Sequence, residues 1–497
     1  MELQCKNLLF FFLQIISVYV TIYLLKLYLK EGINCEKIRT ILITVIIVFS
    51  TMICCSLNAF ALTDGDWEFQ LLDSEVKITK YIGDDTNVVI PEMILGCPVT
   101  SFGYGDKVFN GNKKITSIEF KPKMKEFPDA LCFELPNLET VTLHEGVETI
   151  GSAAFWHCVN LKNINIPSTV KHIQADVFCG CKSLTSVTLP DGIESIGGRC
   201  FESSGITEID LSNVKTGYNT NAIKDTFAWC EKLESVKLSA SVAIIPERMF
   251  IGCTALKNVE IPSGVTEIEK RAFDSCKSLE NIILPSTLKT IGNAAFASTA
   301  LKEIVIPYGT ETIYGTNATF GNCKNLEAIY VPETVKKIYL DIVINCPKAI
   351  VYCSADSYVA NYCKERSISY LTDNSVNSGI HVYYNGERIS FHSYGQNPEI
   401  LDGRTLVPLR SIFEAMGADV EWDGTTSTAI AKRGNIEVKI TIGANEIYKN
   451  GKAIAIDVPA QLMNDRTMVP ARVIAEAFGA DVQWNGNGRA VLISESH

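Results

Sequence analysis

Histidine is scarce in this chain, and the patterns that usually carry enzymatic chemistry are missing. Only six histidines occur among 497 residues, and none of them forms an HxH or HExxH pattern. This argues against a zinc site built on a helix. No glycine-rich phosphate loop and no pair of acids spaced for acid–base catalysis stands out. The sequence therefore predicts a protein that is not an enzyme, with no catalytic residues, no cofactor and no metal.

The chain also lacks any block of basic charge. It carries 45 lysines and arginines against 56 aspartates and glutamates, which gives a net charge of −11. An acidic exterior without a basic patch argues against nucleic acid as a partner. Hydrophobic residues make up 47% of the chain and charged residues 20%, as expected of folded domains. A chain of 497 residues should form two or three of them.

Two long apolar runs, Leu8–Leu29 and Ile41–Leu57, open the chain on either side of a basic loop. Each is long enough, or nearly so, to span a bilayer. The second run ends in a small-x-small triplet, which fits a signal peptide cleaved after Ala61. Two alternatives remain: a hairpin anchor retained in the membrane, or translation that begins near Asn34. In each case we expect the chain from Leu62 onward to lie outside the cytoplasm.

A phenylalanine returns at intervals of 22 to 26 residues through the middle of the chain. The ten positions are Phe109, Phe133, Phe155, Phe178, Phe201, Phe227, Phe250, Phe273, Phe296 and Phe320. So even a spacing indicates a solenoid, in which each repeat forms one coil. In the unit that starts at Phe250, Val259 and Ile261 should point to one face of a short strand. Pro262 should end that strand, because it cannot donate a ladder hydrogen bond.

One such unit cannot cover its own apolar residues, so each coil should bury them against the next coil. The unit at 201–227 departs from the pattern. It is longer and carries the insertion SNVKTGYNTN, and after it Ala240 stands where the strand-ending proline is expected. We expect a bulge or a projecting loop there.

These residues resemble the BspA-like class of leucine-rich repeats, which is found on bacterial surface proteins. The resemblance covers about residues 66–372. Residues 76–103 look like the family's first unit, and residues 353–371 look like its closing coil, with a short helix and a last strand. The resemblance implies an α+β repeat fold, with a leucine-rich-repeat solenoid of about ten 23-residue β-rich coils over residues 62–372.

Seventeen cysteines would suggest disulfides in an exported chain. Six of them share one place, three residues after the phenylalanine. These are Cys158, Cys181, Cys230, Cys253, Cys276 and Cys323. Pro136, Ser204 and Thr299 hold the same place in other units, so we interpret it as a slot for a small buried residue. A disulfide between neighbours such as Cys158 and Cys181 is the alternative, although three consecutive coils cannot all pair among themselves.

A second repeat begins after a polar linker at residues 373–379. Residues 402–424 return as residues 464–486 with a constant offset of 62, and each copy should form a strand, a helix and a strand that ends in tryptophan. The pattern resembles the copper amine oxidase N-terminal domain, or stalk domain, over residues 380–497. It implies a small duplicated α+β domain. In the oxidases this module lies apart from the catalytic core, which is absent here, so the resemblance implies neither copper nor oxidase activity.

Four arginines recur at matching places in the two copies. They are Arg404, Arg410, Arg466 and Arg472. We interpret them as contacts for an anionic wall polymer. The alternative is that they form salt bridges that hold the two halves of the domain together.

The outward strand positions of the solenoid can be followed from coil to coil. They change from uncharged polar residues to charged residues, and then to Ile283, Val305 and Tyr330. Neighbouring strands lie about 4.8 Å apart, so these three should form one apolar patch that faces water and binds a partner. Its polar rim consists of Asn281, Glu303 and Glu327. The alternative is that Ile, Val and Tyr simply suit strands.

These features predict a non-enzymatic binding or adhesion protein that is secreted or displayed on a bacterial cell surface. The solenoid face would engage an extracellular protein or a glycan. The C-terminal module would act as a stalk or attach the chain to a cell-wall polymer, and an uncleaved N-terminal segment would hold it in the membrane. Two alternatives remain: a self-assembling structural component of the envelope, and a polysaccharide-binding accessory to a hydrolase.

Overall fold

The computed structural model describes residues 61–215, 223–377, 379–389, 391, 396–486 and 488–495. The two apolar runs and most of the expected cleavage motif lie outside the described residues. Within these ranges no helix has the length and apolar character needed to cross a membrane. The chain divides into two compact units, residues 1–83 with 93–103 and residues 84–92 with 104–497.

The first unit is built on a five-stranded sheet of order β1-β2-β3-β6-β5. Its strands are β1 (Leu62–Asp64), β2 (Trp67–Leu72), β3 (Glu75–Tyr81), β5 (Met93–Ile94) and β6 (Cys97–Phe102). Strands β1 to β3 pair antiparallel, and β6 joins β3 in parallel. Alternate residues of β2 and β3 are buried, as expected of a sheet with one face against a core.

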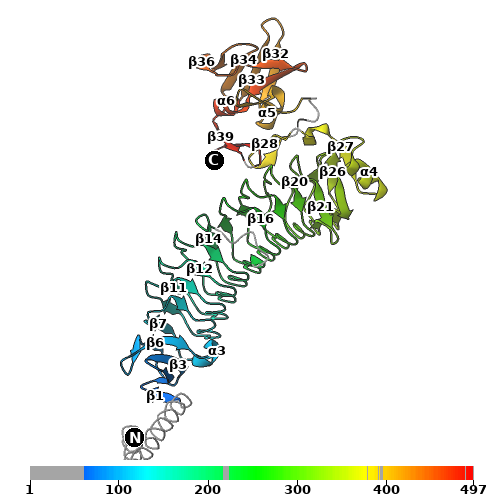
Figure 1. Ribbon diagram of the computed structural model, residues 1–497. Helices are drawn as coiled ribbons and strands as arrows, with labels where there is room; N and C mark the ends of the chain where they lie inside the picture. The colour runs from blue at the N-terminus through cyan, green and yellow to red at the C-terminus, as the bar shows by residue number, and fades with distance from the viewer. Residues whose placement is uncertain are drawn as a thin grey trace, which may run out of the picture. The chain divides into compact units, whose positions relative to one another are not determined.

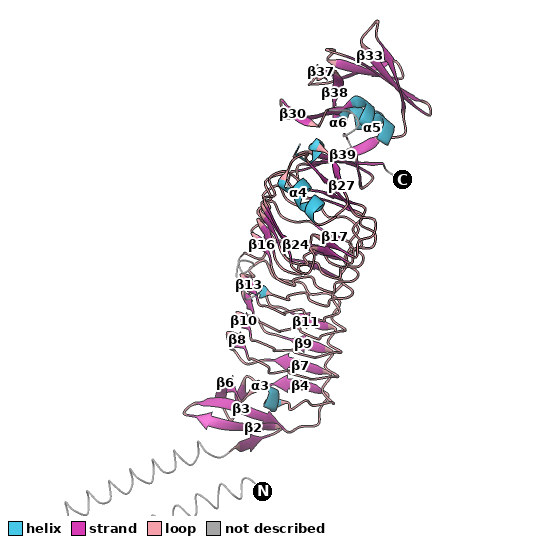
Figure 2. Ribbon diagram, turned by 90° about the vertical axis from the view of Figure 1, so that its right-hand side faces the viewer, coloured by secondary structure: helices cyan, strands magenta, loops and turns pink. Residues whose placement is uncertain are grey.

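The solenoid occupies most of the second unit and contains two sets of parallel strands (Figures 1 and 2). The first ladder comprises β4 (Asn87–Ile90), β7 (Ser117–Phe120), β9 (Thr140–Thr142), β11 (Asn163–Asn165), β14 (Glu208–Asp210), β15 (Ser235–Lys237), β17 (Asn258–Val259), β20 (Glu303–Val305), β23 (Ala328–Tyr330), β26 (Ile350–Cys353) and β27 (Tyr370–Thr372). In β9, as in β14 and β15, the middle residue is buried and its two neighbours are exposed.

The second ladder consists of strands that are mostly two residues long. They are β8 (Glu126–Phe127), β10 (Thr149–Ile150), β12 (His172–Ile173), β13 (Ser195–Ile196), β16 (Ile244–Ile245), β18 (Glu267–Ile268), β19 (Thr290–Ile291), β21 (Thr312–Gly315) and β24 (Lys337–Leu340), with the separate pair β22 (Phe320–Gly321) and β25 (Val343–Ile344). A short helix, α3 (Gly105–Val108), lies near the start of the unit. The 23-residue spacing is therefore confirmed as a stack of coils.

The phenylalanine column forms the centre of this stack. From Phe155 to Phe320 each ring is fully buried and stacks on the next, with centroids 5.3–5.8 Å apart. Phe133 is an exception to the predicted pattern. It stacks on Trp156 at 4.5 Å, while Phe127 packs against Phe155 at 5.1 Å. The backbone register places Cys132 opposite the phenylalanine position, one residue earlier than the spacing indicated.

The cysteines of the column fill small buried slots. Each thiol donates to the carbonyl of a residue in the preceding coil, as Cys253 does to Phe227 (3.1 Å) and Cys276 to Phe250 (3.2 Å). All cysteines within the described ranges are free thiols. Burial raises the pKa of the Cys230 thiol to about 12, which keeps it protonated and able to donate.

The solenoid ends as the sequence indicated, in α4 (Tyr358–Glu365) and strand β27. The Ser357 hydroxyl caps α4 by accepting from the Ala360 backbone N–H at 3.1 Å, a common way to satisfy the first turn of a helix. A 3-10 turn, η2 (Asn374–Asn377), then leads into the C-terminal module.

The C-terminal module is a duplicated α+β domain of three sheets and two helices. Its strands are β28 (His381–Tyr384), β29 (Glu387–Arg388), β30 (Glu399–Leu401), β31 (Arg404–Pro408), β32 (Asp419–Asp423), β33 (Thr428–Arg433), β34 (Ile436–Thr441), β35 (Glu446–Lys449), β36 (Lys452–Ala455), β37 (Gln461–Met463), β38 (Arg466–Pro470), β39 (Ala480–Asn485) and β40 (Ala490–Glu495), and its helices are α5 (Leu409–Ala415) and α6 (Ala471–Ala477).

The two copies of this module face each other across a local two-fold axis. Strands β31 and β38 pair antiparallel, and Val407 lies opposite Val469, its equivalent 62 residues on. The core is shared: Phe413 of α5 meets Phe478 edge-on, with ring centroids 5.3 Å apart. Each half is therefore incomplete without the other.

Candidate binding surfaces

The apolar patch predicted on the solenoid is not open to solvent. Val305 is 6% exposed and Tyr330 is 9% exposed, and Ile283 is half-buried. The prediction that these three residues face water is therefore wrong. Val305 and Tyr330 do lie side by side as predicted, because β20 and β23 pair in parallel with these two residues opposite each other.

Residues from the linker and the C-terminal module cover this patch. Val376 packs with Val305 and Tyr330 in one buried cluster. The Arg388 guanidinium lies over the Tyr330 ring, 4.0 Å from its centroid, in cation–π geometry. A Cβ placed on Gly488 would come within 2.1 Å of the Ile283 side chain. The outward apolar residues thus form an intramolecular contact, which explains their chemistry without an external partner.

The predicted rim is only partly correct. Asn281 and Glu327 are exposed, but Glu327 lies outside the outward column, because Glu303 pairs with Ala328. Glu327 instead forms an ion pair with Lys348 at 3.1 Å. Glu303 is mostly enclosed, and burial raises the pKa of its carboxyl, an effect that Arg388 opposes.

The open part of the strand face lies nearer the N-terminus. The first ladder breaks between β17 and β20, and also between β11 and β14, where residues 186–188 carry no assigned strand. A groove of about 610 Å³ lies at this break. Its polar lining includes Ser186, Thr188, Glu208, Asp210, Ser235 and Lys237.

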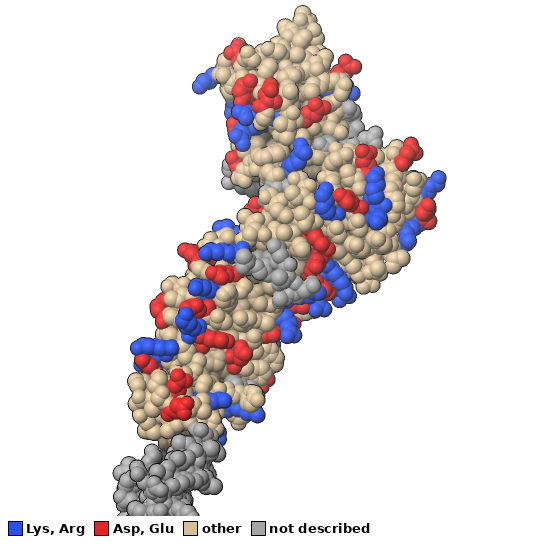
Figure 3. All heavy atoms as spheres, viewed as in Figure 1, with Lys and Arg blue, Asp and Glu red and all other residues tan. Residues whose placement is uncertain are grey.

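This break precedes the long coil at 201–227, whose insertion had predicted an irregularity. Residues 216–222 of that insertion lie outside the described residues. Lys237 and Asp210 form an ion pair of 3.2 Å across adjacent strands. Elsewhere on the solenoid, lysines and glutamates alternate between coils, as in Lys257–Glu234 (2.9 Å), and Figure 3 shows the two signs of charge interspersed.

In the C-terminal module, the four predicted arginines are all exposed, and the fold brings them together in two pairs. Arg404 and Arg472 line one groove of about 430 Å³ beside Trp484. Arg410 and Arg466 line a second groove of about 570 Å³ beside Trp422. Each groove takes its hairpin from one copy and its helix from the other, so sequence reasoning within one copy could not have assembled it.

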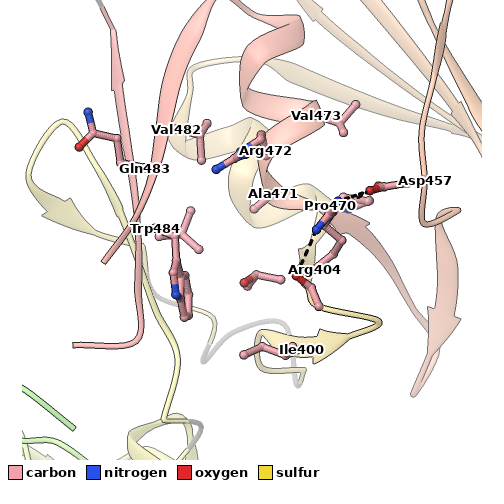
Figure 4. Close-up of a pocket in the computed structure, with 13 residues that line it drawn as sticks. Ile400, Arg404, Asp457, Pro470, Ala471, Arg472, Val473, Val482, Gln483 and Trp484 are labelled. Carbon is pink, nitrogen blue, oxygen red and sulfur yellow. Dashed lines mark hydrogen bonds and ion pairs between the residues drawn. The ribbon is translucent and has the colours of Figure 1, made fainter. Parts of the chain in front are cut away.

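Figure 4 shows the first groove, with Trp484 on one side and the Arg404–Asp457 pair on the other. The Arg404 Nε donates to Asp457 Oδ2 at 2.7 Å, and this arginine holds the pKa of the Asp457 carboxyl below its usual range. Arg472 lies 3.9 Å from Glu476 on its own helix. The equivalent pair Arg410–Glu414 has the same spacing.

One salt bridge between the two halves involves a residue that sequence reasoning missed. Arg433, at the end of β33, lies 2.5 Å from Glu495, at the end of β40. It also donates to the Met416 and Phe478 carbonyls, at 2.8 and 3.1 Å. The offset of 62 makes Arg433 and Glu495 equivalent positions. A difference of charge sign at equivalent positions was the signal in the sequence.

No metal centre emerges from the part of the chain that the structure describes. No group of three or more His, Cys, Asp or Glu side chains within it is arranged to hold a metal ion. His381 is the most deeply buried candidate, and burial lowers its pKa to about 3. Its ring lies near Arg388 and Arg489, neither of which is a metal ligand of choice.

Comparisons with known proteins agree with this architecture. Residues 103–226 and 220–350 match the BspA type leucine rich repeat region, in six copies, and residues 383–493 match the copper amine oxidase N-terminal domain. Repeats of this type are typically non-enzymatic, and the matched oxidase domain is not the catalytic one. No curated protein matches the chain.

Several solved structures are similar to part of the chain. A leucine-rich repeat protein from Bacteroides ovatus is 22% identical, with a TM-score of 0.49 over 65% of this chain and 82% of its own. A leucine rich cell surface protein from Faecalibacterium prausnitzii is 24% identical, with a TM-score of 0.39 over 62% and 97%. These likenesses concern the fold alone. The chain therefore combines a leucine-rich repeat region of the BspA type with a copper amine oxidase N-terminal domain.

Proposed function

We propose that this chain is a non-enzymatic binding protein of the bacterial cell surface. The solenoid engages an extracellular protein or glycan, and the C-terminal module attaches the chain to the envelope or spaces it from the envelope. The groove at the break between β11 and β14 carries this proposal, because it combines an open surface with polar side chains on two adjacent strands. Concave sites with a few well-placed polar groups are the usual form of a binding site.

The chemistry of this groove suits a polar partner. Asp210 and Lys237 form a pair at its edge, and both side chains are more than half exposed. Thr188 and Ser235 add hydroxyls that can donate and accept. The apolar part of the strand face is already covered by the C-terminal module, so a partner reaches the polar part.

Location can be tested on intact cells of the native host. External protease should release fragments of the solenoid, because the proposal places residues 62–372 outside the cytoplasm. N-terminal sequencing of the released protein should begin at Leu62 if the signal peptide is cleaved. A chain that is protected until the cells are lysed would overturn the proposed location.

Binding can be tested with the exported chain on arrays of extracellular proteins and glycans. Lys237→Glu should lower the affinity for the partner found on the arrays by about tenfold or more, because it reverses a charge at the groove. The matched control is Lys171→Glu, which changes another exposed, ion-paired lysine, this one beside the second ladder. Equal loss in both variants, or in neither, would contradict a site at this groove.

A further inference from the structure

We infer that the two grooves of the C-terminal module bind a neutral polysaccharide, with one sugar ring on Trp422 and another on Trp484. This inference rests on the proposed role of the module in attachment to the envelope and names the class of ligand. It also changes the reading of the arginines, from contacts for an anionic polymer to hydrogen-bonding groups for sugar hydroxyls.

The exposure of the two tryptophans is the first observation. Trp422 is 48% exposed and Trp484 is 43% exposed, and they are equivalent residues near the ends of β32 and β39. A large apolar ring left open to water at both equivalent places indicates a surface that is covered by something else. A flat aromatic face can stack against the C–H face of a sugar ring while the tip of the indole stays polar.

The polar groups beside each ring are the second observation. A sugar hydroxyl both donates and accepts, so a site for it needs both kinds of group. The first groove offers the Arg404 guanidinium, the Asp457 carboxylate and the Gln483 amide. The second offers Arg466, with the carboxylates of Glu421 and Asp465. Each groove thus has donors and acceptors around one indole.

The balance of charge favours a neutral ligand. Arg404 already bonds Asp457, and Arg410 and Arg472 each have a glutamate one helical turn away at 3.9 Å. Two further carboxylates, Glu421 and Asp465, line the second groove. A polyanion would meet these acids at close range, where like charges repel. A neutral sugar would use both signs.

The two-fold relation of the grooves favours a polymer over a single sugar. Val407 and Val469 face each other at the axis, so the module presents two similar sites on one shared core. A ligand with repeated rings can occupy both sites, and the second contact then forms at a high effective concentration. Each groove can be weak on its own and the module can still hold a polysaccharide firmly.

Binding of the full chain to immobilised neutral glucans, mannans and galactans tests the inference, with an acidic polyuronate as the comparison. We expect retention on at least one neutral polymer, little affected by salt because screening acts on charges. Trp422→Ala and Trp484→Ala should each weaken it tenfold or more, and the double variant should abolish it. Trp229→Ala is the matched control, since Trp229 is a similarly exposed tryptophan of the solenoid.

Three results would overturn the inference: no retention on any neutral polymer, retention that survives the double variant, or loss in the Trp229→Ala control. A fourth result would favour an anionic polymer as the ligand instead. In that case the chain would bind only the polyuronate, and binding would be lost at high salt and in the double variant Arg410→Gln, Arg472→Gln. Lys237→Glu should keep full retention on the polymer. If polymer binding fails while partner binding at the solenoid groove persists, only the polysaccharide inference is wrong. If polymer binding persists while no partner binds the solenoid groove, only the proposed function of the solenoid is wrong.

Discussion

The solenoid and the C-terminal module both arise from sequence repeats, but the repeats meet in different ways. In the solenoid, successive coils are related by a shift along the stack. Each residue therefore lies beside the equivalent residue of the next coil, and Phe273 stacks on Phe250 and Phe296. In the module, a two-fold axis brings equivalent positions face to face. Residues at the axis must therefore suit each other, as Arg433 suits Glu495. Stacked coils can carry the same residue at the same place in each coil. Positions that meet across a two-fold axis need residues that complement each other in charge or size.

The same contrast appears in side-chain size. Phe413 and Phe478 meet in the shared core of the module, while their equivalents are Ala475 and Met416. A large residue in one copy is matched by a smaller one in the other, because both contribute to a single interior. In the solenoid column the ring is kept in each coil from Phe155 to Phe320.

The largest effect should come from breaking each core and comparing how the damage spreads. Phe273→Ala should destabilise its region by about 3–5 kcal/mol, and faster hydrogen exchange should be concentrated in residues 227–320, because a coil contacts mainly its neighbours. Phe413→Ala should cost a similar amount but should accelerate exchange throughout the module. If hydrogen exchange became faster across the whole solenoid in the Phe273→Ala variant, the damage would not be local, and the contrast between solenoid and module would be wrong.

The next largest effect should be a dependence of the stability of the C-terminal module on pH. His381 of the module is buried, and burial lowers its pKa to about 3. An unfolded histidine titrates near 6.5, so the folded state resists protonation and stability falls as pH drops from about 6.5 toward about 3. The loss should be about 2 kcal/mol by pH ~5, at about 1.36 kcal/mol for each pH unit.

Urea unfolding of the module at neutral and acidic pH measures this dependence. His381→Phe should flatten it, because the side chain at this position no longer titrates. If this variant keeps the pH dependence of the parent, His381 is not its source.

The smallest effects should come from two ion pairs of similar length. Arg433–Glu495 joins the halves of the module with side chains 26% and 30% exposed, and Lys257–Glu234 joins two coils with side chains 57% and 58% exposed. A double-mutant cycle to alanine should give a coupling of about 1–2 kcal/mol for the first pair, because it is partly buried and bonds two carbonyls. The second should give less than about 0.5 kcal/mol. Equal couplings would mean that the two-fold axis places no special demand on this pair.

Much of the fold could be predicted from the sequence, because residues at regular spacings along the chain define both repeats. Val259 and Ile261 are both buried as their spacing predicted, although the strand itself is only Asn258–Val259 and ends before Ile261 and Pro262. Neighbouring coils supply the same contacts at each step. The error at Phe133 shows the limit of spacing alone. A shift of one residue placed Cys132 at the column position, and only the backbone register revealed it.

The sequence by itself determined the coil length, the buried column, the offset of 62 and the residue types of the candidate sites. Only the tertiary structure decided which surfaces remain open. Tyr330 is covered by Arg388, more than 50 residues on, and the two grooves combine side chains from opposite copies. Such contacts depend on how whole elements dock, which periodicity within one segment does not encode. Arg433 and Glu495, 62 residues apart, carry opposite charges at equivalent positions, but only the two-fold axis shows that these positions meet.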